Sequence, residues 1–181
     1  MEAIKTFDVD GASVRIVMDK DPENPRDWDN LGTLALYHRR YSLGDKHKPP
    51  MEEAKLIEKD KDYICLKVYG YDHGGLVFQT TPYSCPWDSG EAGIIYVDKQ
   101  TVRKEYGWKV ITQKRRQHIE RILDGEVETY SNYVSGQVYG YIIDIDGQEK
   151  SCYGFYELEH CIEEATANAK YMVHNLKTQT A

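Results

Sequence analysis

The amino-acid sequence predicts an α+β fold, with a mainly antiparallel sheet and two longer helices packed against it. Apolar runs joined by glycine-containing turns indicate hairpins at residues 63–81 and 138–156. Apolar residues at helical spacing indicate long helices in residues 112–136 and 159–176. The resulting order of strands, helix, hairpin and helix is typical of α+β proteins and not of alternating βαβ units.

The first third of the chain holds two predicted strands and one short predicted helix. Residues 13–18 alternate apolar and polar side chains, which predicts one strand near the N-terminus. Residues 31–38 are apolar and predict a short strand or the start of a buried segment, and the charged residues 52–60 predict an exposed helical turn or two. The apolar face of the first strand comprises Val14, Ile16 and Met18.

Between these strands, residues 19–30 form an acidic stretch in which two prolines prevent a regular element. Its spacing begins like a calcium-binding loop, with Asp19 and Asp21 at positions one and three. It then departs from that template, because position six is not glycine and position twelve is Asn30 instead of Glu. We therefore expect a solvated acidic loop here.

The middle of the chain predicts a three-stranded arrangement followed by a short helix. Residues 63–69 and 76–81 pair as an antiparallel hairpin across a glycine-rich turn, and residues 94–97 supply a third strand. Asp98 has the side chain expected of a helix N-cap, and Gly107 is the residue expected to close that helix.

The C-terminal part predicts two helices separated by a hairpin. Thr112 caps the first helix and Gly136 ends it. Asp146-Gly147 is a strong turn signal within the hairpin 138–156, and residues 159–176 carry the apolar stripe of the final helix. Because no repeat, low-complexity tract or linker interrupts the chain, we expect a single domain over residues 1–181.

Composition restricts the function classes. The formal net charge of −7 argues against a general nucleic-acid binder, which needs a cationic face. No secretory start and no apolar run of about 20 residues is present, so we expect no membrane partner. Four cysteines without CxxC spacing then predict reduced thiols in a cytoplasm. The 15 tyrosines suit either strands or a binding surface.

Residues 69–93 combine turn residues with reactive side chains, which raises a catalytic hypothesis. In it Cys85 is the nucleophile, His73 or His38 the base, and Asp88 or Asp72 the residue that orients the base. The pattern around Cys85 matches no thiol-protease signature, and no helix N-terminus is evident to lower its pKa.

A metal hypothesis and a structural one compete for the same loops. No HxH or HxxxH spacing supports a metal site, so its ligands would have to converge from separate loops. The structural interpretation is preferred, because aspartate beside turn residues commonly bonds its own backbone, with Trp28 and Trp87 as anchors over the sheet end. The candidate metal ligands are Asp29, His38, Asp72, His73 and Asp88.

Charge is segregated along the C-terminal half. Residues 103–121 carry seven basic and two acidic residues, whereas residues 124–164 carry ten acidic residues and one basic residue. If the acidic residues share one exposed face, that face suits a basic channel in a partner; otherwise it is a solvated face. The candidate binding residues are Glu126, Glu128, Glu157, Glu159, Glu163, Glu164, Tyr130 and Tyr133.

Seven sequence blocks stand out along the chain: WDNLGT at 28–33, HRRY at 38–41, LGD at 43–45, YDHGG at 71–75, PYSCPWDSG at 82–90, EVETY at 126–130 and VYG at 138–140. Together they resemble a group of small acidic proteins encoded by bacteriophages and other mobile elements. The resemblance covers most of the chain and carries no assigned activity and no site residues. It implies a context in which small acidic proteins inhibit host defence nucleases or polymerases.

We therefore expect a non-enzymatic accessory protein of the host cytoplasm, without a cofactor, that inhibits a host defence or nucleic-acid-processing complex. The expected protein is of the anti-CRISPR or anti-restriction type. One alternative is a small metal- or cysteine-dependent hydrolase centred on the YDHGG and CPWDSG loops. Another is a structural protein that self-associates through its tyrosine-rich sheet.

Overall fold

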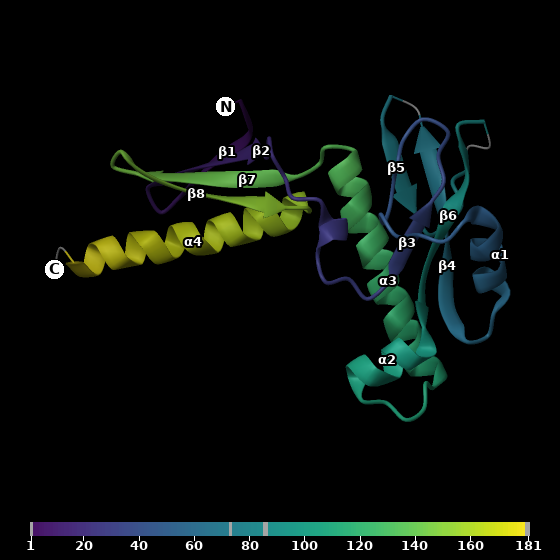
Figure 1. Ribbon diagram of the computed structural model, residues 1–181. Helices are drawn as coiled ribbons and strands as arrows, with labels where there is room; N and C mark the ends of the chain where they lie inside the picture. The colour runs from purple at the N-terminus through teal and green to yellow at the C-terminus, as the bar shows by residue number, and fades with distance from the viewer. Residues whose placement is uncertain (1, 73, 85–86, 180–181) are drawn as a thin grey trace. The chain divides into compact units, whose positions relative to one another are not determined.

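The computed structural model describes residues 2–72, 74–84 and 87–179. Its contacts divide the chain into two compact units, drawn in Figure 1. Unit 1 comprises Met1–Glu23 and Gly136–Ala181, and unit 2 comprises Asn24–Ser135. Unit 2 is thus an insertion, in the sequence, between two segments of unit 1, and each unit has its own sheet and core.

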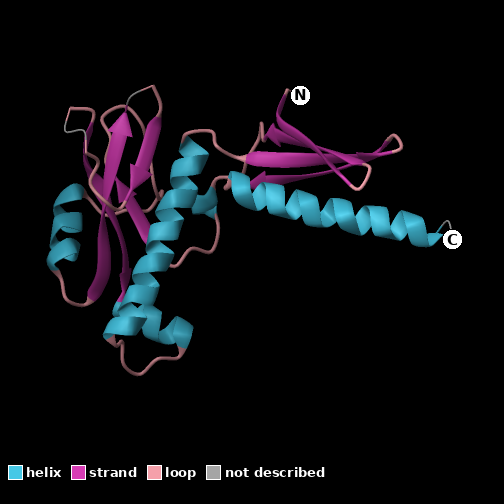
Figure 2. Ribbon diagram, turned by 180° about the vertical axis from the view of Figure 1, so that it is seen from behind, coloured by secondary structure: helices cyan, strands magenta, loops and turns pink. Residues whose placement is uncertain are grey.

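Unit 1 is a four-stranded antiparallel sheet in the order β1-β2-β7-β8, with one long helix along one face (Figure 2). The α+β prediction with a mainly antiparallel sheet is confirmed, here and in unit 2. The elements of unit 1 are β1 (Ala3–Val9), β2 (Ala12–Met18), β7 (Tyr139–Ile145), β8 (Gln148–Phe155) and α4 (Leu158–Gln179).

The core of unit 1 lies between its sheet and α4. Val14 pairs with Ile143 across β2 and β7, and both are buried. Small side chains on the helix let it approach the sheet closely, namely Cys161, Ala165 and Ala169. Their recurrence at four-residue spacing puts them on one helix face, as the predicted stripe required.

The N-terminal segment differs from the sequence prediction. Instead of one strand, residues 3–18 form the β1–β2 hairpin, whose turn residues Asp10 and Gly11 have positive φ angles of 55° and 95°. Gly11 N donates to Asp8 Oδ1 at 3.1 Å, which stabilises the turn. Met18 is exposed and not in the core, because it is the last residue of β2.

Unit 2 contains a second antiparallel sheet, in the order β3-β6-β4-β5. Helix α3 covers one face of this sheet, and α1 packs against the other. Its elements are the 3₁₀ helix η1 (Pro25–Asp27), β3 (Thr33–Leu36), α1 (Met51–Lys59), β4 (Tyr63–Asp72), β5 (Leu76–Gln79), β6 (Ser89–Asp98), α2 (Lys99–Tyr106) and α3 (Gln113–Val134).

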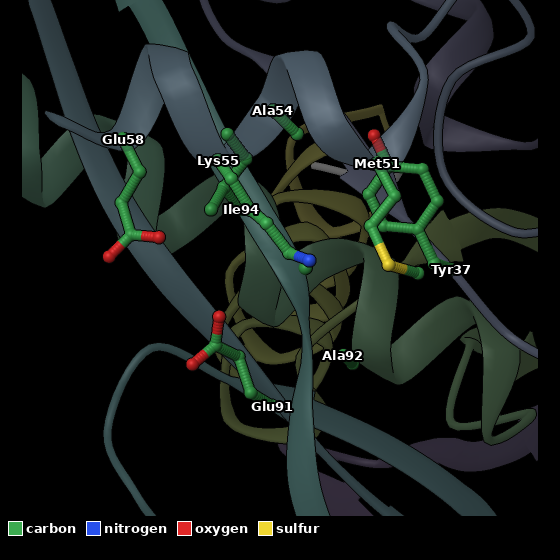
Figure 3. A pocket seen from close by; sticks show the side chains of 9 residues that line it. Tyr37, Met51, Ala54, Lys55, Glu58, Glu91, Ala92 and Ile94 are labelled. Carbon is green, nitrogen blue, oxygen red and sulfur yellow. The ribbon is translucent and has the colours of Figure 1, made fainter. Parts of the chain in front are cut away.

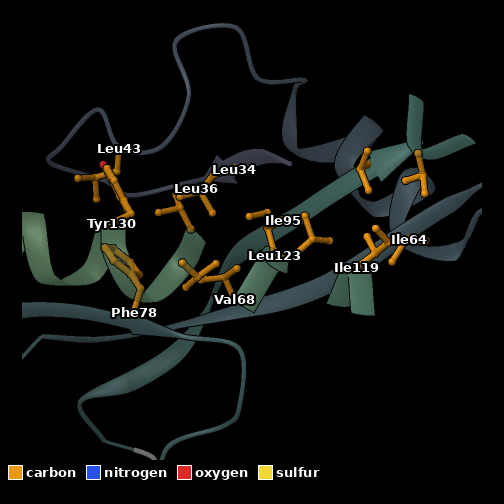
Figure 4. Packing of buried hydrophobic residues seen from close by; sticks show 13 residues of the cluster. Leu34, Leu36, Leu43, Ile64, Val68, Phe78, Ile95, Ile119, Leu123 and Tyr130 are labelled. Atoms are coloured by element: carbon orange, nitrogen blue, oxygen red, sulfur yellow. The ribbon is translucent and has the colours of Figure 1, made fainter. Parts of the chain in front are cut away.

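The larger core of unit 2 lies between α3 and the sheet (Figure 4). Ile119 and Leu123 from the helix are fully buried against the sheet residues Ile64 and Ile95. The face of α1 toward the sheet is also buried, through Ala54 and Ile57, so this helix is only half exposed. Burial of these apolar side chains supplies the main stabilisation of the unit.

Local capping signals are confirmed by the structure. The Asp98 carboxylate accepts from Thr101 N at 2.8 Å and begins α2, and Gly107 ends that helix with a left-handed φ of 64°. The Thr112 hydroxyl accepts from Arg115 N at 3.4 Å and begins α3. The predicted turn at Asp146-Gly147 has two positive φ angles, which the twist of a two-residue hairpin requires.

Among the described residues, every helix is too short or too polar to cross a membrane.

Candidate functional site

The described residues of the reactive stretch 69–93 form one end of the unit 2 sheet. Asp72 is the last residue of β4, and its backbone N–H donates to the carbonyl of Asp88 at 3.0 Å. The predicted catalytic residues His73 and Cys85 lie outside the described residues. Trp87 is 91% exposed and Trp28 is 44% exposed, so neither is the buried anchor expected over the sheet end.

The two buried or half-buried cysteines of the described chain are poorly suited to nucleophilic chemistry. Burial, reinforced by the nearby Glu58 charge, raises the pKa of the Cys65 thiol to about 12. Burial also raises the pKa of the Cys161 thiol to about 11, with a further contribution from Cys152. Because the thiolate is the nucleophile, both thiols are unreactive near neutral pH.

The candidate metal ligands do not converge in the described part of the chain. Asp29 is exposed in the loop after η1, and His38 accepts a hydrogen bond from Arg40 N at 3.2 Å while stacking on Tyr41. Within residues 2–72, 74–84 and 87–179, no three histidine, cysteine or carboxylate side chains gather as a metal site would require. His73 lies outside these residues.

The acidic stretch before β3 is held by a buried arginine. The Arg26 side chain is only 3% exposed. Its Nε donates to Asp45 Oδ1 at 2.6 Å, its Nη1 to Glu126 Oε2 at 3.0 Å, and its Nη2 to the carbonyl of Gly32 at 2.6 Å. Although burial alone lowers the pKa of Arg26, its hydrogen bonds and the charges of both carboxylates raise it overall. The predicted solvated loop is therefore anchored to α3.

The carboxylates of this network also bind the backbone. Glu126 Oε1 accepts from Leu31 N at 2.8 Å, and Asp45 Oδ2 accepts from Leu34 N at 2.9 Å. The phenol oxygen of Tyr130, which is 4% exposed, accepts from Gly44 N at 2.9 Å. Glu126 and Tyr130, which the sequence places among binding residues, are thus interior residues that fix the loops around β3.

The remaining candidate binding residues fall into two groups. Glu128 is exposed and Tyr133 is half-buried on α3 in unit 2. The other four glutamates are exposed in unit 1, at the start and along the first half of α4. They are Glu157, Glu159, Glu163 and Glu164.

The net charge is distributed unequally between the two units, which the composition of the whole chain does not show. Unit 1 contains 13 acidic and 6 basic residues, which gives −7, whereas unit 2 contains 17 of each and is neutral. The whole net charge of the chain therefore resides in unit 1. Within unit 2 the basic residues concentrate in α2, the connection 107–112 and the first half of α3.

Figure 3 shows a small hollow between α1 and β6, with Tyr37, Lys55 and Ile94 on its walls. Its volume of about 230 Å³ is below the 300–1,000 Å³ typical of small-molecule sites. Glu58 and Glu91 at its rim both pair with Lys67, at 3.2 and 2.9 Å. The hollow is therefore too small, and its carboxylates too engaged, to define an active site.

A larger hollow of about 460 Å³ lies between β5 and α3 in unit 2. Ser131 Oγ at its floor accepts from Phe78 N at 2.8 Å, and the Thr80 hydroxyl donates to Asp124 at its rim. These bonds tie the edge strand β5 to the helix, so the polar groups at the base of the hollow are already satisfied.

Comparison with known proteins adds no assignment: no protein-family model matches the chain, and neither the curated proteins nor the solved structures give a significant match.

Proposed function

We propose that this chain is a non-enzymatic binding protein that docks through the acidic surface of unit 1 on a basic surface of a host protein. The observation that carries the proposal is the segregation of charge, because the entire net charge of −7 belongs to unit 1. A concentrated charge of one sign steers association with a partner of the opposite sign and raises its rate.

Helix stability alone does not explain all of the glutamates on α4, and this supports a role for them in docking. A carboxylate in the first turn, such as Glu159, is favoured by the positive end of the helix dipole. Glu163 and Glu164 lie beyond that turn, where the dipole gives little benefit, and both are exposed. Glu163 lies four positions after Glu159, so the two like charges share one helix face and repel each other, which is a cost that a basic partner would offset.

The class of partner follows from the same chemistry. Enzymes that process nucleic acids present basic channels to phosphate groups. An acidic helix face with carboxylates at this density would compete for such a channel. With the resemblance to proteins of bacteriophages and mobile elements, this favours a host defence nuclease or a related nucleic-acid-processing complex as the target, in the host cytoplasm.

The test uses the purified full chain and a panel of bacterial restriction and CRISPR-type nucleases. We expect dose-dependent inhibition of DNA cleavage by at least one nuclease, and at least tenfold weaker inhibition by the Glu163→Lys, Glu164→Lys double variant. The matched control reverses two exposed glutamates of unit 2, in Glu52→Lys, Glu53→Lys, and is expected to retain inhibition. Absence of inhibition and of binding across the panel, or equal loss in both variants, would count against the proposal.

A further inference from the structure

We propose that the end of unit 2 formed by α2, residues 107–112 and the first half of α3 binds the phosphate backbone of nucleic acid. We call this region the basic end. It belongs to a different unit from the acidic surface and carries charge of the opposite sign, so this inference stands independently of the proposed function.

The basic end carries an excess of cationic side chains. Figures 1 and 2 show α2 beside the N-terminal part of α3 at one end of unit 2. Residues 103–121 include seven basic residues and only two acidic ones. Those whose side chains are exposed are Arg103, Lys104, Lys109, Lys114 and Arg121.

The helices that carry these charges are held rigidly. Tyr106 stacks on Trp108 with ring centroids 4.5 Å apart, and both rings pack against the core of unit 2. The Arg115 guanidinium lies 4.7 Å from the centroid of Trp108 and donates to the carbonyl of Val110 at 2.7 Å. Val102 fixes α2 because it is fully buried. Cations on a fixed support lose less entropy when they bind an extended anion.

The charge distribution along α3 is unfavourable for helix stability, because basic residues lie at its N-terminal end. Its first turn contains Lys114, Arg115 and Arg116 and no acidic residue. Cations at a helix N-terminus are unfavourable, since that end of the helix dipole is already positive. By contrast, Arg103 and Lys104 at the C-terminal end of α2 are favoured by its dipole. A local violation of this kind is expected where a function requires it, and a bound phosphate would relieve it.

One face of α3 continues the cationic surface away from the turn. Lys114, Gln117 and Arg121 lie at positions i, i+3 and i+7 and line an open hollow of about 520 Å³. The carboxylate of Glu120 at this hollow accepts from Arg116 Nε at 2.8 Å, and Asp124 accepts from Thr80. Glu120 is thereby paired with a cation, whereas the neutral Thr80 hydroxyl does not offset the Asp124 carboxylate, so Asp124 marks the limit of the cationic face.

The breadth of the basic end identifies the ligand class. Its charges are spread over two helices and their connection, and the adjoining hollow is open. A single phosphate ion would need an enclosed cradle of donors. A duplex presents one negative charge per roughly 1.7 Å of its axis, which suits a broad array of cations. The net charge of the chain hides this region, because unit 1 supplies the whole excess of acidic residues.

The test measures fluorescence anisotropy of a labelled 20-base-pair DNA duplex with the full chain at 50 and 200 mM NaCl. We expect binding at 50 mM that weakens steeply at 200 mM. Lys109→Gln, Lys114→Gln should weaken binding on the order of tenfold and lower the salt slope by about 2, because each lost phosphate contact lowers it by roughly 1. Lys59→Gln, Lys61→Gln removes the same charge from two exposed sites, one at the end of α1 and one just after it, and should stay within twofold of wild type.

Three outcomes would overturn the inference. The first is no binding of duplex or single-stranded DNA by the wild-type chain at 50 mM NaCl. The second is an equal loss of affinity in the control variant. The third is that poly-glutamate displaces the labelled duplex as effectively as unlabelled DNA does at equal charge. That result would identify an acidic polypeptide, and not nucleic acid, as the ligand of the basic end. This experiment does not measure nuclease inhibition. A failure of the proposed function would therefore not affect its outcome.

Discussion

The guanidinium of Arg26 meets the carboxylate of Glu126 at 3.0 Å, although the two residues are 100 positions apart in the chain. The contact joins the loop before β3 to the middle of α3, and Asp45 completes it from a second loop. Charged groups so far from solvent persist only when they are paired and hydrogen-bonded. Two loops of unit 2, one on either side of β3, are thereby fixed to one helix.

Replacing Arg26 tests this network directly. Arg26→Met removes the cation and leaves two carboxylates with low exposure uncompensated, so we expect unit 2 to lose about 3–5 kcal/mol of unfolding free energy. Urea denaturation followed by circular dichroism measures the loss. Arg40→Met, at an exposed arginine, is the control and should change stability by less than about 0.5 kcal/mol. A stability of Arg26→Met close to wild type would show that the ion pairs contribute little.

Gly93 is expected to tolerate no side chain. A Cβ there would lie 1.9 Å from the carbonyl oxygen of Ala35, a backbone atom that cannot rotate away. Gly93→Ala should therefore destabilise unit 2 by about 2 kcal/mol or more, since overpacked sites force the backbone to shift. The matched control is Gly90→Ala in the same strand, where an added Cβ meets nothing within 4 Å. Thermal unfolding of the two variants should differ clearly, and equal melting temperatures would contradict the close approach.

Asp98 gives a pH-dependent contribution through the cap of α2. Burial alone would raise its pKa, but hydrogen bonds from the Thr101 hydroxyl and from backbone N–H groups outweigh it and lower the pKa below the ordinary value. A depressed pKa adds stability that is present above the unfolded-state pKa and is lost as pH falls through the folded-state pKa. Asp98→Ala should cost about 1 kcal/mol at pH 7.

The difference between wild type and Asp98→Ala should shrink as the pH is lowered below about 4, the usual range of an aspartate in an unfolded chain. Chemical denaturation at pH 7, 5 and 3 measures this difference. Asp146→Ala, at an exposed turn of unit 1, tests whether loss of any aspartate has the same effect. A difference that stays constant with pH would mean that the ionised form of Asp98 is not what caps the helix.

Thiol labelling distinguishes the cysteines by exposure and pKa. In the native protein at pH 8, Cys152 should react rapidly with a thiol reagent because its side chain is exposed. Cys65 and Cys161 should react slowly, because burial holds their pKa values at about 12 and 11 and keeps the thiolate scarce. Mass spectrometry of the labelled peptides assigns each site. The same experiment tests the catalytic hypothesis for Cys85, which predicts selective modification near neutral pH.

Features determined by a few neighbouring residues were predictable from the sequence. Asp98 and Thr112 cap helices through bonds to residues three positions away, so their signals are local. The turn at Asp146-Gly147 is of the same kind. The alternation of residues 13–18 predicts a single strand, whereas the structure has the β1–β2 hairpin, whose turn at Asp10-Gly11 carries the same signal as Asp146-Gly147.

Features that depend on distant partners were not predictable. Arg26 stands among carboxylates in the sequence, yet its partners are 19 and 100 positions away. Glu126 and Tyr130 are predicted as surface binding residues, because their residue types and local charge do not reveal that their side chains are largely buried. The division into two units does not follow from the sequence, because Pro22 and Pro25 beside one boundary and Gly136 at the other are equally typical of loops inside one domain.

The placement of unit 2 within the chain has a consequence for engineering. The chain leaves unit 1 after β2 and re-enters before β7, and these strands are antiparallel neighbours with Met18 opposite Tyr139. The two attachment points are therefore as close as the ends of a hairpin. Excising residues 24–135 and closing the gap with a short glycine-containing turn would yield a four-stranded meander with its helix, a miniature scaffold into which other inserts can be grafted.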